Sequence, residues 1–535
     1  MRVLTVVASI ILFVACQHPN MQPRSQTNDL SASSPEFTRP NIILFLVDDM
    51  GLMDMSVPML VDKNGEAKPH PLNSFYRTPN LEKLADNGVR FTQFYAHSVC
   101  SPTRVSIFTG QNSARHKTTQ WIHPLHNNSG NYGPKDWNWN GLTKENATLL
   151  TMLNEAGYQT IHVGKGHFAP AQAEGANPIN IGFDENIGGA AHGAPGSYYG
   201  EEAYGKKKNK NIVPHLEAYH NTDTFLTEAL TLEANKAIAR AAEKNTPFFL
   251  YMSHYAVHTP FYSDPRFISN YDNTHKSEIA KTYASMVEGI DHSMGQLLEQ
   301  LEQLNIAEDT LVIFLGDNGS TAPLSENKDL RFEPYTHASS APLRGMKGTS
   351  YEGGMRVPFI ASWAKPVPDN KNQQRLPIAQ GKTITQIGSI LDILPTLQTI
   401  SAPDFSIQTT VDGDVLSKQF AGQFNHSRRQ TFLNHFPHVH RSSYFTSYVN
   451  GDWKLVYFYP LKETFKVLDP LRHHGHSECR LFNLKDDPYE KYDLSKSHHK
   501  ELKQMMRAMQ AELDSMNALY PLKDDTVLLP SLACL

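Results

Sequence analysis

Short apolar runs that end in polar residues recur between residues 41 and 360 of the chain. Their Val, Ile, Leu and Phe residues follow one another without alternation, which predicts strands that are covered on both faces, as in a parallel sheet. The four clearest runs lie at 41–51, 158–168, 247–260 and 310–320. Ligands of such folds bind beyond the carboxyl ends of the strands, so we expect the polar ends of these runs to face one cleft.

Two longer segments between the runs, at 222–243 and 280–304, have apolar residues at helical spacing. One face of the second segment carries Tyr283, Met286, Val287, Ile290, Met294, Leu297, Leu301 and Leu304. Strands that alternate with helices in this way predict an α/β fold.

The composition is that of an ordinary globular protein, with 535 residues of which 40% are hydrophobic and 19% charged. A chain of this length can form one large hydrophobic core or about two to three separate domains. The net charge of −5 and the lack of a long basic run argue against a nucleic-acid partner.

The N-terminus differs from the rest of the chain. An apolar run after Arg2 is too short to span a bilayer and has the form of a secretory signal over residues 1–16. The segment FVAC resembles a bacterial lipobox, in which Cys16 is lipidated, and a cleaved signal without a lipid is the alternative. Residues 17–39 are rich in Ser, Asn, Gln and Pro, which predicts a flexible tether. We therefore expect an exported bacterial protein, in the periplasm or as an outer-membrane lipoprotein, that touches the membrane only through this anchor.

Three cysteines follow Cys16, namely Cys100, Cys479 and Cys534. Export places them in an oxidising compartment, where an odd number leaves one thiol over. Cys479 and Cys534 both lie in the C-terminal region, and they either pair with each other or remain two thiols. Cys100 is then the odd cysteine and needs a separate explanation.

The polar ends of two runs supply hard oxygen ligands. Asp48 and Asp49 follow the first run, and Asp317 and Asn318 follow the last. Such donors suit Ca²⁺ or Mg²⁺ rather than zinc, and neither a CxxC nor an HExxH spacing occurs. Asp-Asp and Asp-Asn-Gly are also common in turns, which is the structural alternative. Because four runs of one chain end in polar residues, we favour one common site, in which the oxygen ligands of two of these runs hold a cation.

Cationic and protonatable residues accompany these oxygen ligands. They are Arg104, Lys165, His167, His258 and Lys347. Together with a divalent cation they suit a tetrahedral oxyanion, namely phosphate or sulfate, and the imidazoles can move protons near neutral pH.

Cys100 begins the segment CSPTR, in which Pro102 fits the first turn of a helix. The start of a helix directs backbone N–H groups toward an anion. A thiolate beside a hard cation is a poor match, whereas an oxygen nucleophile suits such a cation. The sequence therefore indicates that Cys100 is not used as an unmodified cysteine.

These motifs together resemble the type I, formylglycine-dependent sulfatases of the alkaline phosphatase-like superfamily. CSPTR is similar to the sulfatase signature, in which the cysteine is oxidised enzymatically to Cα-formylglycine, or 3-oxoalanine. Six segments resemble the family's blocks in family order: TPNLEKLADNGVRFTQFYAHSVCSPTR, GYQTIHVGKGHF, PFFLYMSHYAVHTP, YASMVEGIDHSMGQLL, LVIFLGDNGS and PLRGMKGTSYEGGMRVP. GDWKLVYF and CRLFNLKDDPYEKYDLS are similar to the family's C-terminal subdomain.

The resemblance implies a sandwich with a large, mostly parallel central sheet flanked by helices, in a catalytic domain over residues 40–415. It also implies a smaller C-terminal α+β subdomain over residues 425–535, with an antiparallel sheet. An apolar stripe at helical spacing predicts the buried face of a helix in this subdomain, formed by Leu502, Met505, Met506, Met509, Leu513 and Met516.

The resemblance further implies a ligand set for one calcium ion, with magnesium as the less favoured alternative. The ligands would be Asp48, Asp49, modified Cys100, Asp317 and Asn318.

The remaining polar residues receive roles in the same way. Arg104 and Lys165 would hold the aldehyde-derived group, and His167, His258 and Lys347 would contact the sulfate. The family commonly has Trp after the lysine of GKGH, where this chain has Gly, so a wall of the pocket is expected to be missing.

The implied reaction explains the modification, because a hydrated aldehyde carries two hydroxyl groups on one carbon. One hydroxyl would attack sulfur with Asp317 as base, while cationic groups stabilise the developing negative charge. The sugar alcohol would leave with a proton from His258 or Lys347. The second hydroxyl would then lose its proton to His167 and expel sulfate as the aldehyde forms again.

Three further segments have an unusual composition. Residues 121–142 are polar and contain Trp121, Trp137 and Trp139, which either stack on sugar rings or pack beneath the loop. His-rich segments lie at 435–441 and 472–476, and we interpret them as solvated loops at the mouth of the cleft rather than as a second metal site.

The expected substrate is a sulfated polysaccharide or its oligosaccharides, and the expected maturation partner is a formylglycine-generating enzyme. Two alternatives stay open: a phosphate mono- or diesterase of the same superfamily, and a catalytically silent surface protein that binds glycans.

Overall fold

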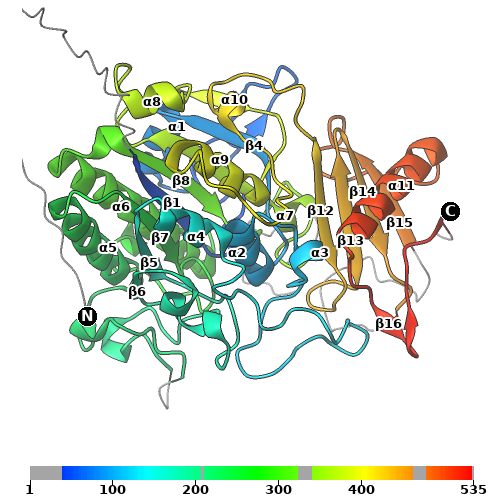
Figure 1. The fold of residues 1–535 in the computed structure, drawn as a ribbon, viewed down its shortest axis with the longest axis horizontal. Coiled ribbons are helices and arrows are strands. Elements are labelled where there is room, and N and C mark those ends of the chain that lie inside the picture. Colours follow the sequence, from blue (N-terminus) through cyan, green and yellow to red (C-terminus); the bar gives the residue numbers. More distant parts are fainter. Residues whose placement is uncertain (1–38, 207–209, 323–339, 462–477, 533–535) are drawn as a thin grey trace, which may run out of the picture. The chain divides into compact units, whose positions relative to one another are not determined.

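The apolar runs form the inner strands of a nine-stranded, mostly parallel sheet (Figure 1). The strand order is β10-β4-β9-β8-β1-β7-β5-β6, with β11 beside β4, and β9 runs antiparallel to both of its neighbours. The computed structural model describes residues 39–206, 210–322, 340–461 and 478–532. The strands of this sheet are β1 (Asn41–Val47), β4 (Val89–Tyr95), β5 (Gln159–Gly164), β6 (Glu185–Ile187), β7 (Phe248–His254), β8 (Thr310–Gly316), β9 (Arg356–Trp363), β10 (Lys382–Ile384) and β11 (Gly388–Ser389).

The four runs that end in polar residues are adjacent strands of this sheet. β1 pairs in parallel with β8 on one side and with β7 on the other, and Val47 lies opposite both Gly316 and His254. β5 continues the sheet beyond β7, with Gly164 opposite Ser253. Because the four strands are parallel and end at nearly the same level, the residues that follow them start from one edge of the sheet.

The side chains of β1 alternate between two hydrophobic cores, so the sheet is covered on both faces as the sequence predicts. One face packs against α2 (Cys100–Thr109), α4 (Thr148–Glu155) and α9 (Ile393–Ser401). The other face packs against α1 (Pro79–Asp86), α5 (Leu226–Glu243) and α6 (Glu278–Gln303). The helices α5 and α6 confirm the two predicted helical segments.

Short elements connect these layers. The short helices are α3 (Ser113–His116), α7 (Glu352–Met355), α8 (Lys371–Arg375) and α10 (Ser417–Phe420), and the small hairpins pair β2 (Leu60–Val61) with β3 (Ala67–Lys68) and β16 (Leu522–Lys523) with β17 (Thr526–Val527). Single 3₁₀ turns lie at η1 (Glu174–Ala176), η2 (Pro178–Ile181), η3 (Gly200–Glu202), η4 (Glu217–Tyr219), η5 (Ile268–Tyr271), η6 (Ala307–Asp309) and η8 (Ile390–Asp392).

The C-terminal part is an antiparallel sheet covered by one helix, as expected (Figure 1). Its strands follow the order β12 (Thr431–Phe436), β13 (Phe445–Asn450), β14 (Trp453–Phe458) and β15 (Glu478–Asn483), and α11 (His499–Ser515) packs on it. The predicted apolar stripe of α11 is buried in this interface. Phe432 of β12 stacks on Tyr95 of β4, at 5.5 Å between ring centroids, so the two sheets share a hydrophobic core. The domain boundary near residues 415–425 stays a prediction.

Several sequence predictions fall outside the described residues. The signal, the tether and Cys16 lie within residues 1–38, and Cys534 and the His-rich segment 472–476 are likewise outside. Cys479 is disulfide-bonded, whereas Cys100 is a free cysteine. Within the described ranges, none of the helices is long and apolar enough to cross a membrane.

Candidate active site

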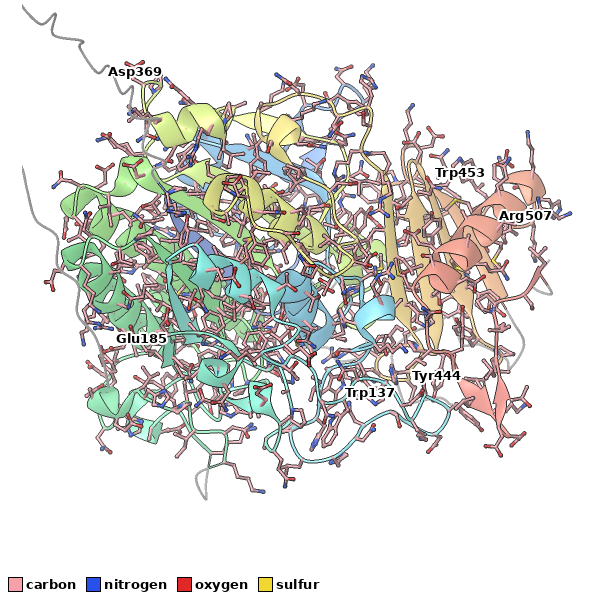
Figure 2. All side chains as sticks on the ribbon, in the orientation of Figure 1. Trp137, Glu185, Asp369, Tyr444, Trp453 and Arg507 are labelled. Carbon is pink, nitrogen blue, oxygen red and sulfur yellow. The ribbon has the colours of Figure 1, made fainter. Side chains whose placement is uncertain are left out.

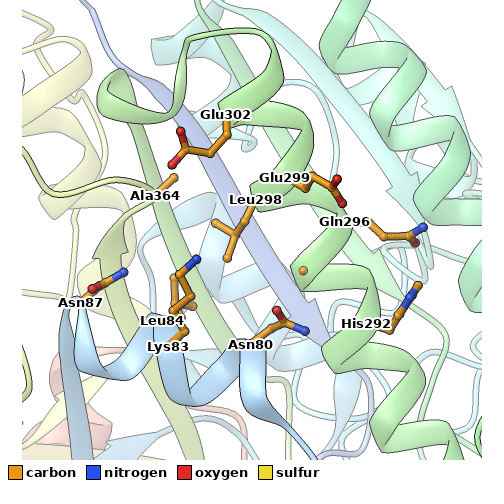
Figure 3. A pocket seen from close by; sticks show the side chains of 11 residues that line it. Asn80, Lys83, Leu84, Asn87, His292, Gln296, Leu298, Glu299, Glu302 and Ala364 are labelled. Atoms are coloured by element: carbon orange, nitrogen blue, oxygen red, sulfur yellow. The ribbon is translucent and has the colours of Figure 1, made fainter.

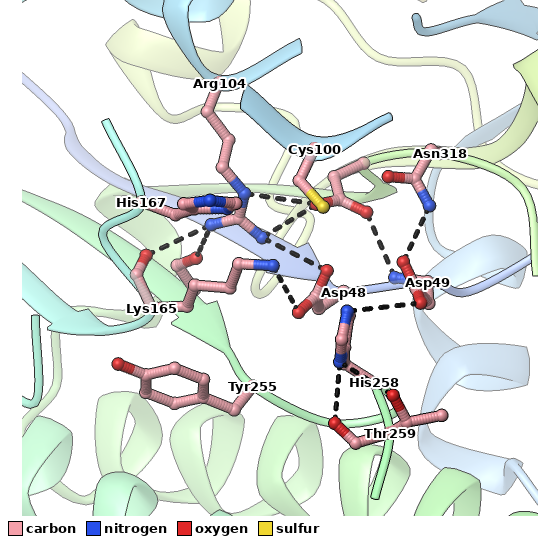
Figure 4. Close-up of polar contacts among 12 residues, drawn as sticks. Asp48, Asp49, Cys100, Arg104, Lys165, His167, Tyr255, His258, Thr259 and Asn318 are labelled. Atoms are coloured by element: carbon pink, nitrogen blue, oxygen red, sulfur yellow. Dashed lines mark hydrogen bonds and ion pairs between the residues drawn. The ribbon is translucent and has the colours of Figure 1, made fainter. Parts of the chain in front are cut away.

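The predicted site residues meet at the carboxyl edge of the central sheet (Figure 4). The strand ends β1, β8, β5 and β7 lead into Asp48 and Asp49, Asp317 and Asn318, Lys165 and His167, and His258, respectively. α2 contributes Cys100 and Arg104, and the loop before α7 contributes Lys347. His254, which also ends an apolar run, instead contacts Ser293 of α6 at 2.9 Å and lies apart from this cluster.

Cys100 is the first residue of α2 and is only 2% exposed. The ammonium group of Lys347 donates to its Sγ at 3.2 Å. Burial raises the pKa of the Cys100 thiol, and the neighbouring Lys165 and Lys347 offset this effect only in part. The thiol therefore holds its proton near neutral pH and is a poor nucleophile as it stands.

Buried ion pairs fix the carboxylates at the ends of β1 and β8. Lys165 Nζ lies 2.6 Å from Asp48 Oδ2, and Arg104 donates to Asp317 Oδ2 from Nε at 3.1 Å and from Nη2 at 2.9 Å. Asp317 also accepts the backbone N–H of Asp49 at 3.0 Å. Because these side chains are fully buried, each charge depends on its partner, and the loss of one partner is costly.

The charges also set the pKa values of two carboxyl groups. Burial alone would raise the pKa of Asp49, but Lys347, His258 and Lys165 hold it well below its usual range. Burial and the neighbouring Asp48 raise the pKa of Asp317 to about 6. Asp317 is therefore the more basic of these two carboxylates.

The site has the chemical features of a hard-cation site. Single ligand atoms of Asp48, Asp49, Cys100 and His258 all lie within 4.8 Å of one another. The buried Oδ1 atoms of Asp48 and Asn318 accept no hydrogen bond from any described residue, although Arg104 Nη2 lies 3.8 Å from the former. Unpaired buried oxygens are costly, and a divalent cation would satisfy them. This group contains three of the predicted ligands, Asp48, Asp49 and Cys100, and His258 is an additional candidate ligand.

The two imidazoles have defined tautomers in their neutral forms, because each contacts a carbonyl that can only accept. His167 donates from Nε2 to Ile122 O at 2.8 Å, and its buried Nδ1 accepts from no described residue. His258 donates from Nδ1 to Thr259 O at 2.7 Å, and its Nε2 lies 3.7 Å from Asp49 Oδ2.

Both imidazoles are neutral in the substrate-free site. The pKa of His258 is lowered to about 3, mainly by burial. The neighbouring Asp49 raises this pKa, whereas Lys347 and Lys165 lower it further. Burial and Lys165 hold the pKa of His167 well below its usual range. An anionic substrate group would raise both pKa values, because it stabilises the imidazolium forms.

Two site residues have backbone conformations that non-glycine residues rarely adopt. Asp49 has φ 59° and His167 has φ 55°. Such conformations cost on the order of 1–3 kcal/mol and persist where the surroundings enforce them, as at functional sites. The fold therefore holds these side chains in place at the expense of local strain.

The position after Lys165, where the sequence led us to expect a missing pocket wall, is not an open gap. A Cβ on Gly166 would lie 3.0 Å from Ala190 O and 3.3 Å from Ala190 N. His167 donates its backbone N–H to the same Ala190 carbonyl at 3.0 Å. The segment around Ala190 thus occupies the space beside Gly166, and His192 of this segment lines the pocket.

A cavity of about 460 Å³ opens above the cluster. Besides the predicted catalytic residues Cys100, His167, His258 and Lys347, it is lined by residues for which the sequence indicated no catalytic role, although Trp121 was a candidate for sugar stacking and 435–441 was placed at the mouth of the cleft. The main ones are Trp121, His123, Leu125, His192, His440 and Arg441. His440 and Arg441 come from the C-terminal part, and the only signal for them was the His-rich segment 435–441.

Of the three clustered tryptophans, Trp121 lines the cavity, and its stacking on sugar rings stays a prediction. Trp137 is buried and donates from Nε1 to Asn127 Oδ1 at 2.7 Å, and Trp139 donates from Nε1 to His123 O at 3.0 Å (Figure 2).

The interpretation of 435–441 as a solvated loop is wrong for two of its histidines. His435 is 1% exposed and His438 is fully buried, because Nε2 of His435 contacts Leu519 O after α11 at 2.6 Å and Nδ1 of His438 contacts Ser129 O in the tryptophan-containing loop at 2.9 Å.

A second hollow of similar volume lies between α1 and α6 (Figure 3). Its lining combines amide, carboxylate and aliphatic side chains such as Asn80, Gln296, Glu299 and Leu298. None of the strand-end residues faces it, so the chemistry described above belongs to the first cavity.

The fold and the strand-end site define a hydrolase of tetrahedral oxyanion esters, and comparison with known proteins gives the family. The family description "Sulfatase" matches residues 40–400. N-acetylgalactosamine-6-sulfatase of Mus musculus is 30% identical over 411 residues, which are 74% of this chain and 68% of that protein. Arylsulfatase A of Homo sapiens is 28% identical over 494 residues, which are 88% and 86% of the two chains.

A solved structure agrees with these relatives. The crystal structure of Ps i-CgsB superimposes with a TM-score of 0.66 at 26% identity and covers 89% of this chain and 93% of its own. The chain therefore belongs to the sulfatase family, and it is a sulfuric ester hydrolase with the alkaline phosphatase-like fold.

Proposed function

We propose that the chain removes sulfate groups from a sulfated polysaccharide or its oligosaccharides, with Cys100 converted to Cα-formylglycine. The position of Cys100 carries this proposal. Its Sγ marks where an oxygen on the same carbon would lie, 3.2 Å from Lys347 Nζ and within 4.8 Å of ligand atoms of Asp48, Asp49 and His258. An oxygen nucleophile at that place would face both a cation and an ammonium group.

We propose calcium as the cation, held by Asp48, Asp49, Asp317, Asn318 and the modified residue 100. When bound, the ion supplies positive charge that polarises the sulfate and the attacking hydroxyl. Several carboxylate and amide oxygens from separate loops suit the flexible coordination of Ca²⁺ better than the strict octahedron of Mg²⁺. Metal analysis of the purified protein should find calcium at about one ion per chain, and zinc in its place would contradict the assignment.

The protein's own groups provide the proton transfers. The carboxylate of Asp317 takes the proton of the attacking hydroxyl, since it is more basic than the carboxylate of Asp49. The S–O bond to the sugar breaks, and the leaving alkoxide takes a proton from Lys347, whose raised pKa keeps it charged, or from His258. Nδ1 of His167 then accepts the proton of the second hydroxyl, the C–O bond between residue 100 and the sulfate breaks, sulfate leaves with both bonding electrons, and the aldehyde forms again.

The carbohydrate nature of the substrate has two supports. Ps i-CgsB has been crystallised with k-i-k-neocarrahexaose, and the mouse relative is an N-acetylgalactosamine-6-sulfatase. In this chain, Trp121 and several imidazoles line the cavity, and aromatic rings beside polar groups suit the faces of sugar rings.

A substrate panel tests this proposal against its closest rival. Matched sulfate and phosphate esters of one aryl alcohol and one sugar should show kcat/KM higher for the sulfates by at least about 100-fold, or roughly 2.7 kcal/mol. Cys100→Ala, purified in parallel, is the matched control for contaminating hydrolases. A higher kcat/KM for the phosphate esters would reject the proposed sulfatase activity and favour the alternative that the protein is a phosphoesterase.

The location of the protein in the cell is a further part of the proposal. We propose export through the signal at residues 1–16 and lipidation of Cys16, so that the enzyme meets polysaccharide outside the cytoplasm. Cys100 is 2% exposed after folding, so a formylglycine-generating enzyme would have to act on the unfolded chain. Mass analysis of the mature N-terminus should find a lipid-modified Cys16, and an unmodified N-terminus at another residue would reject the anchor.

A further inference from the structure

One wall of the active-site cavity is the segment that follows β6. This strand is parallel to β5 and ends at Ile187, so the segment starts from the same edge of the sheet as the strand-end cluster. It first passes Gly166, where Ala190 O accepts the backbone N–H of His167 at 3.0 Å. It then reaches His192, whose side chain is half-buried and lines the cavity. The backbone of this wall is thus joined to the residue that we assign to sulfate release.

The residue after His192 lies against the imidazole of His167. A Cβ on Gly193 would lie 2.5 Å from Cε1 and 2.6 Å from Nδ1 of this ring. A residue without a Cβ is therefore needed at this position, because the backbone approaches the ring so closely. This close packing places His192 beside a catalytic imidazole.

A hydrogen bond to Tyr255 defines the tautomer of His192. Tyr255 directly follows β7 and is fully buried, and its ring stacks on that of His192 with 5.8 Å between the ring centroids. The hydroxyl group of Tyr255 donates its one proton to Gly188 O at 2.9 Å. Its oxygen must then accept from Nε2 of His192, at 3.3 Å. Nδ1 of the neutral His192 ring therefore carries a lone pair and no proton.

This lone pair is available to a ligand in the cavity. Nδ1 of His192 has no hydrogen-bond partner among the described residues, and unlike Nδ1 of His167 it is not shut off from solvent. Burial and the charge of Lys165 lower the pKa of His192 to about 4, so the ring is neutral and remains an acceptor near neutral pH. A sulfate group has only acceptor oxygens and does not match such a nitrogen, whereas a hydroxyl group or an amide N–H does.

We infer that His192 is a specificity-determining residue, which accepts at Nδ1 a hydrogen bond from a neutral donor of the sugar that carries the cleaved sulfate. This donor is a hydroxyl group or the N–H of an acetamido group. The inference rests on the proposed function, because that function places the cleaved sulfate between Cys100 and His167. It narrows the substrate class to sugars that keep this donor free of a second sulfate group.

Sugar sulfates that lack one donor test this contact. The parent compound is the monosaccharide that the wild-type protein hydrolyses with the highest kcat/KM among the sulfates of galactose, glucose and N-acetylgalactosamine. Each analogue lacks one hydroxyl group, and an analogue of an N-acetylated parent carries an acetate ester in place of the acetamido group. The analogue without the contacted donor should have a kcat/KM about tenfold below that of the parent, and its identity distinguishes a hydroxyl from an N–H donor. Equal values for the parent and every analogue would overturn the inference without any variant.

Substitution of His192 assigns the contact to this residue. His192→Phe should reduce the tenfold ratio to near one, because phenylalanine can stack on Tyr255 but has no acceptor. His192→Asn should retain a part of the ratio, since its amide oxygen can replace Nδ1 as acceptor. The matched control is His292→Phe, because His292 is exposed on α6 at the second hollow, and its change should leave the ratio unaltered. A wild-type ratio in His192→Phe would overturn the assignment.

Binding measurements separate this inference from the proposed function. Calorimetric titration of the Cys100→Ala protein with all of these compounds measures affinity without turnover. Preference for a parent over one analogue, lost when His192→Phe is added, would support the contact even if the wild-type protein hydrolysed none of the sulfates. Turnover of sugar sulfates without any such preference would support the proposed function and reject the contact. Absence of both binding and turnover for every sugar sulfate would overturn both.

Discussion

At the scale of single residues, the environment of Cys100 is unsuited to thiolate chemistry. Its side chain is buried, its pKa is raised, and it faces oxygen ligands that prefer a hard partner. The same environment suits two hydroxyl groups on one carbon, because Lys347 and a cation can orient one of them while a base reaches the other.

Substitution of Cys100 should separate attack from release. Cys100→Ala should lose turnover by at least about 10⁴-fold, since the nucleophile is absent. Cys100→Ser should accept at most one sulfate group slowly, because its ester lacks the second hydroxyl that expels sulfate. Mass spectrometry after incubation with substrate measures this, and multiple turnovers by the serine variant would contradict the release step.

His258 should matter most for poor leaving groups. It is neutral in the substrate-free site, and the bound sulfate would raise its pKa and let it protonate the leaving alkoxide. His258→Ala should lower kcat/KM for sugar sulfates by about 10²–10³-fold and for 4-nitrophenyl sulfate by much less, as expected of general acids. Equal losses on both substrates would assign the proton to Lys347 alone.

At the scale of elements, a buried ionic cluster joins the catalytic loop to the C-terminal sheet. Lys454 of β14 is fully buried, and its ammonium group lies 2.9 Å from Oε1 of Glu352 and 2.9 Å from Oε1 of Glu490. Glu490 also accepts the backbone N–H of Glu352 at 2.7 Å, and its carbonyl accepts from Arg344 at 2.9 Å. These contacts brace both sides of the loop that carries Lys347.

Removal of the ammonium group from this cluster should destabilise the whole protein. Lys454→Met leaves two buried carboxylates without their shared cation, which should cost about 3–5 kcal/mol of unfolding free energy. Lys503→Met, on the exposed face of α11, is the matched control and should change it by less than about 0.5 kcal/mol. Denaturant titration measures the free energy of unfolding of both variants. Equal changes in the two variants would show that the ionic cluster contributes little to the stability of the protein.

A tryptophan at position 166 should not rebuild a pocket wall in this chain. Its Cβ would meet the carbonyl and amide of Ala190, which are backbone atoms and cannot move aside easily. Gly166→Trp should therefore cost about 1–3 kcal/mol of stability, and Gly166→Ala should cost less. Thermal unfolding measures both, and an unchanged or higher melting temperature of the tryptophan variant would contradict this packing.

The elements also show what the sequence could predict. Continuous apolar runs predicted the strands at 41–51 and 310–320 and their polar ends, because a strand covered on both faces leaves a clear pattern. The helices α5 and α6 followed from their periodicity. The filling of the space beside Gly166 by Ala190 could not be predicted, since no local pattern reports which loop packs against which.

At the scale of the whole molecule, both parts of the chain contribute to the cavity of the candidate active site. The ends of central-sheet strands supply the polar cluster, and the turn between β12 and β13 adds His440 and Arg441 to the lining of the cavity. The two parts share a hydrophobic core in which Tyr95 stacks on Phe432. The C-terminal part thus contributes to the lining of the candidate active-site cavity.

This arrangement explains why the strand-end cluster was predictable, whereas the contact of Arg441 with the loop that carries Lys347 was not. Asp48, Lys165 and Asp317 lie at ends of strands whose order follows general rules for α/β folds. Arg441 reaches Gly348 only through the packing of two sheets, and the sequence carries no periodic signal for that contact. Its neighbours His435 and His438 were predicted to be solvated for the same reason.

The central claim is that residue 100 works as an aldehyde hydrate in a sulfate-cleaving site. Mass spectrometry of the peptide around residue 100, from turnover-competent protein made in its native host, tests this claim most directly. We predict that this peptide has the mass expected for formylglycine at residue 100, and that its aldehyde reacts with a hydrazide probe. An intact cysteine in protein that still cleaves sulfate esters would contradict the account.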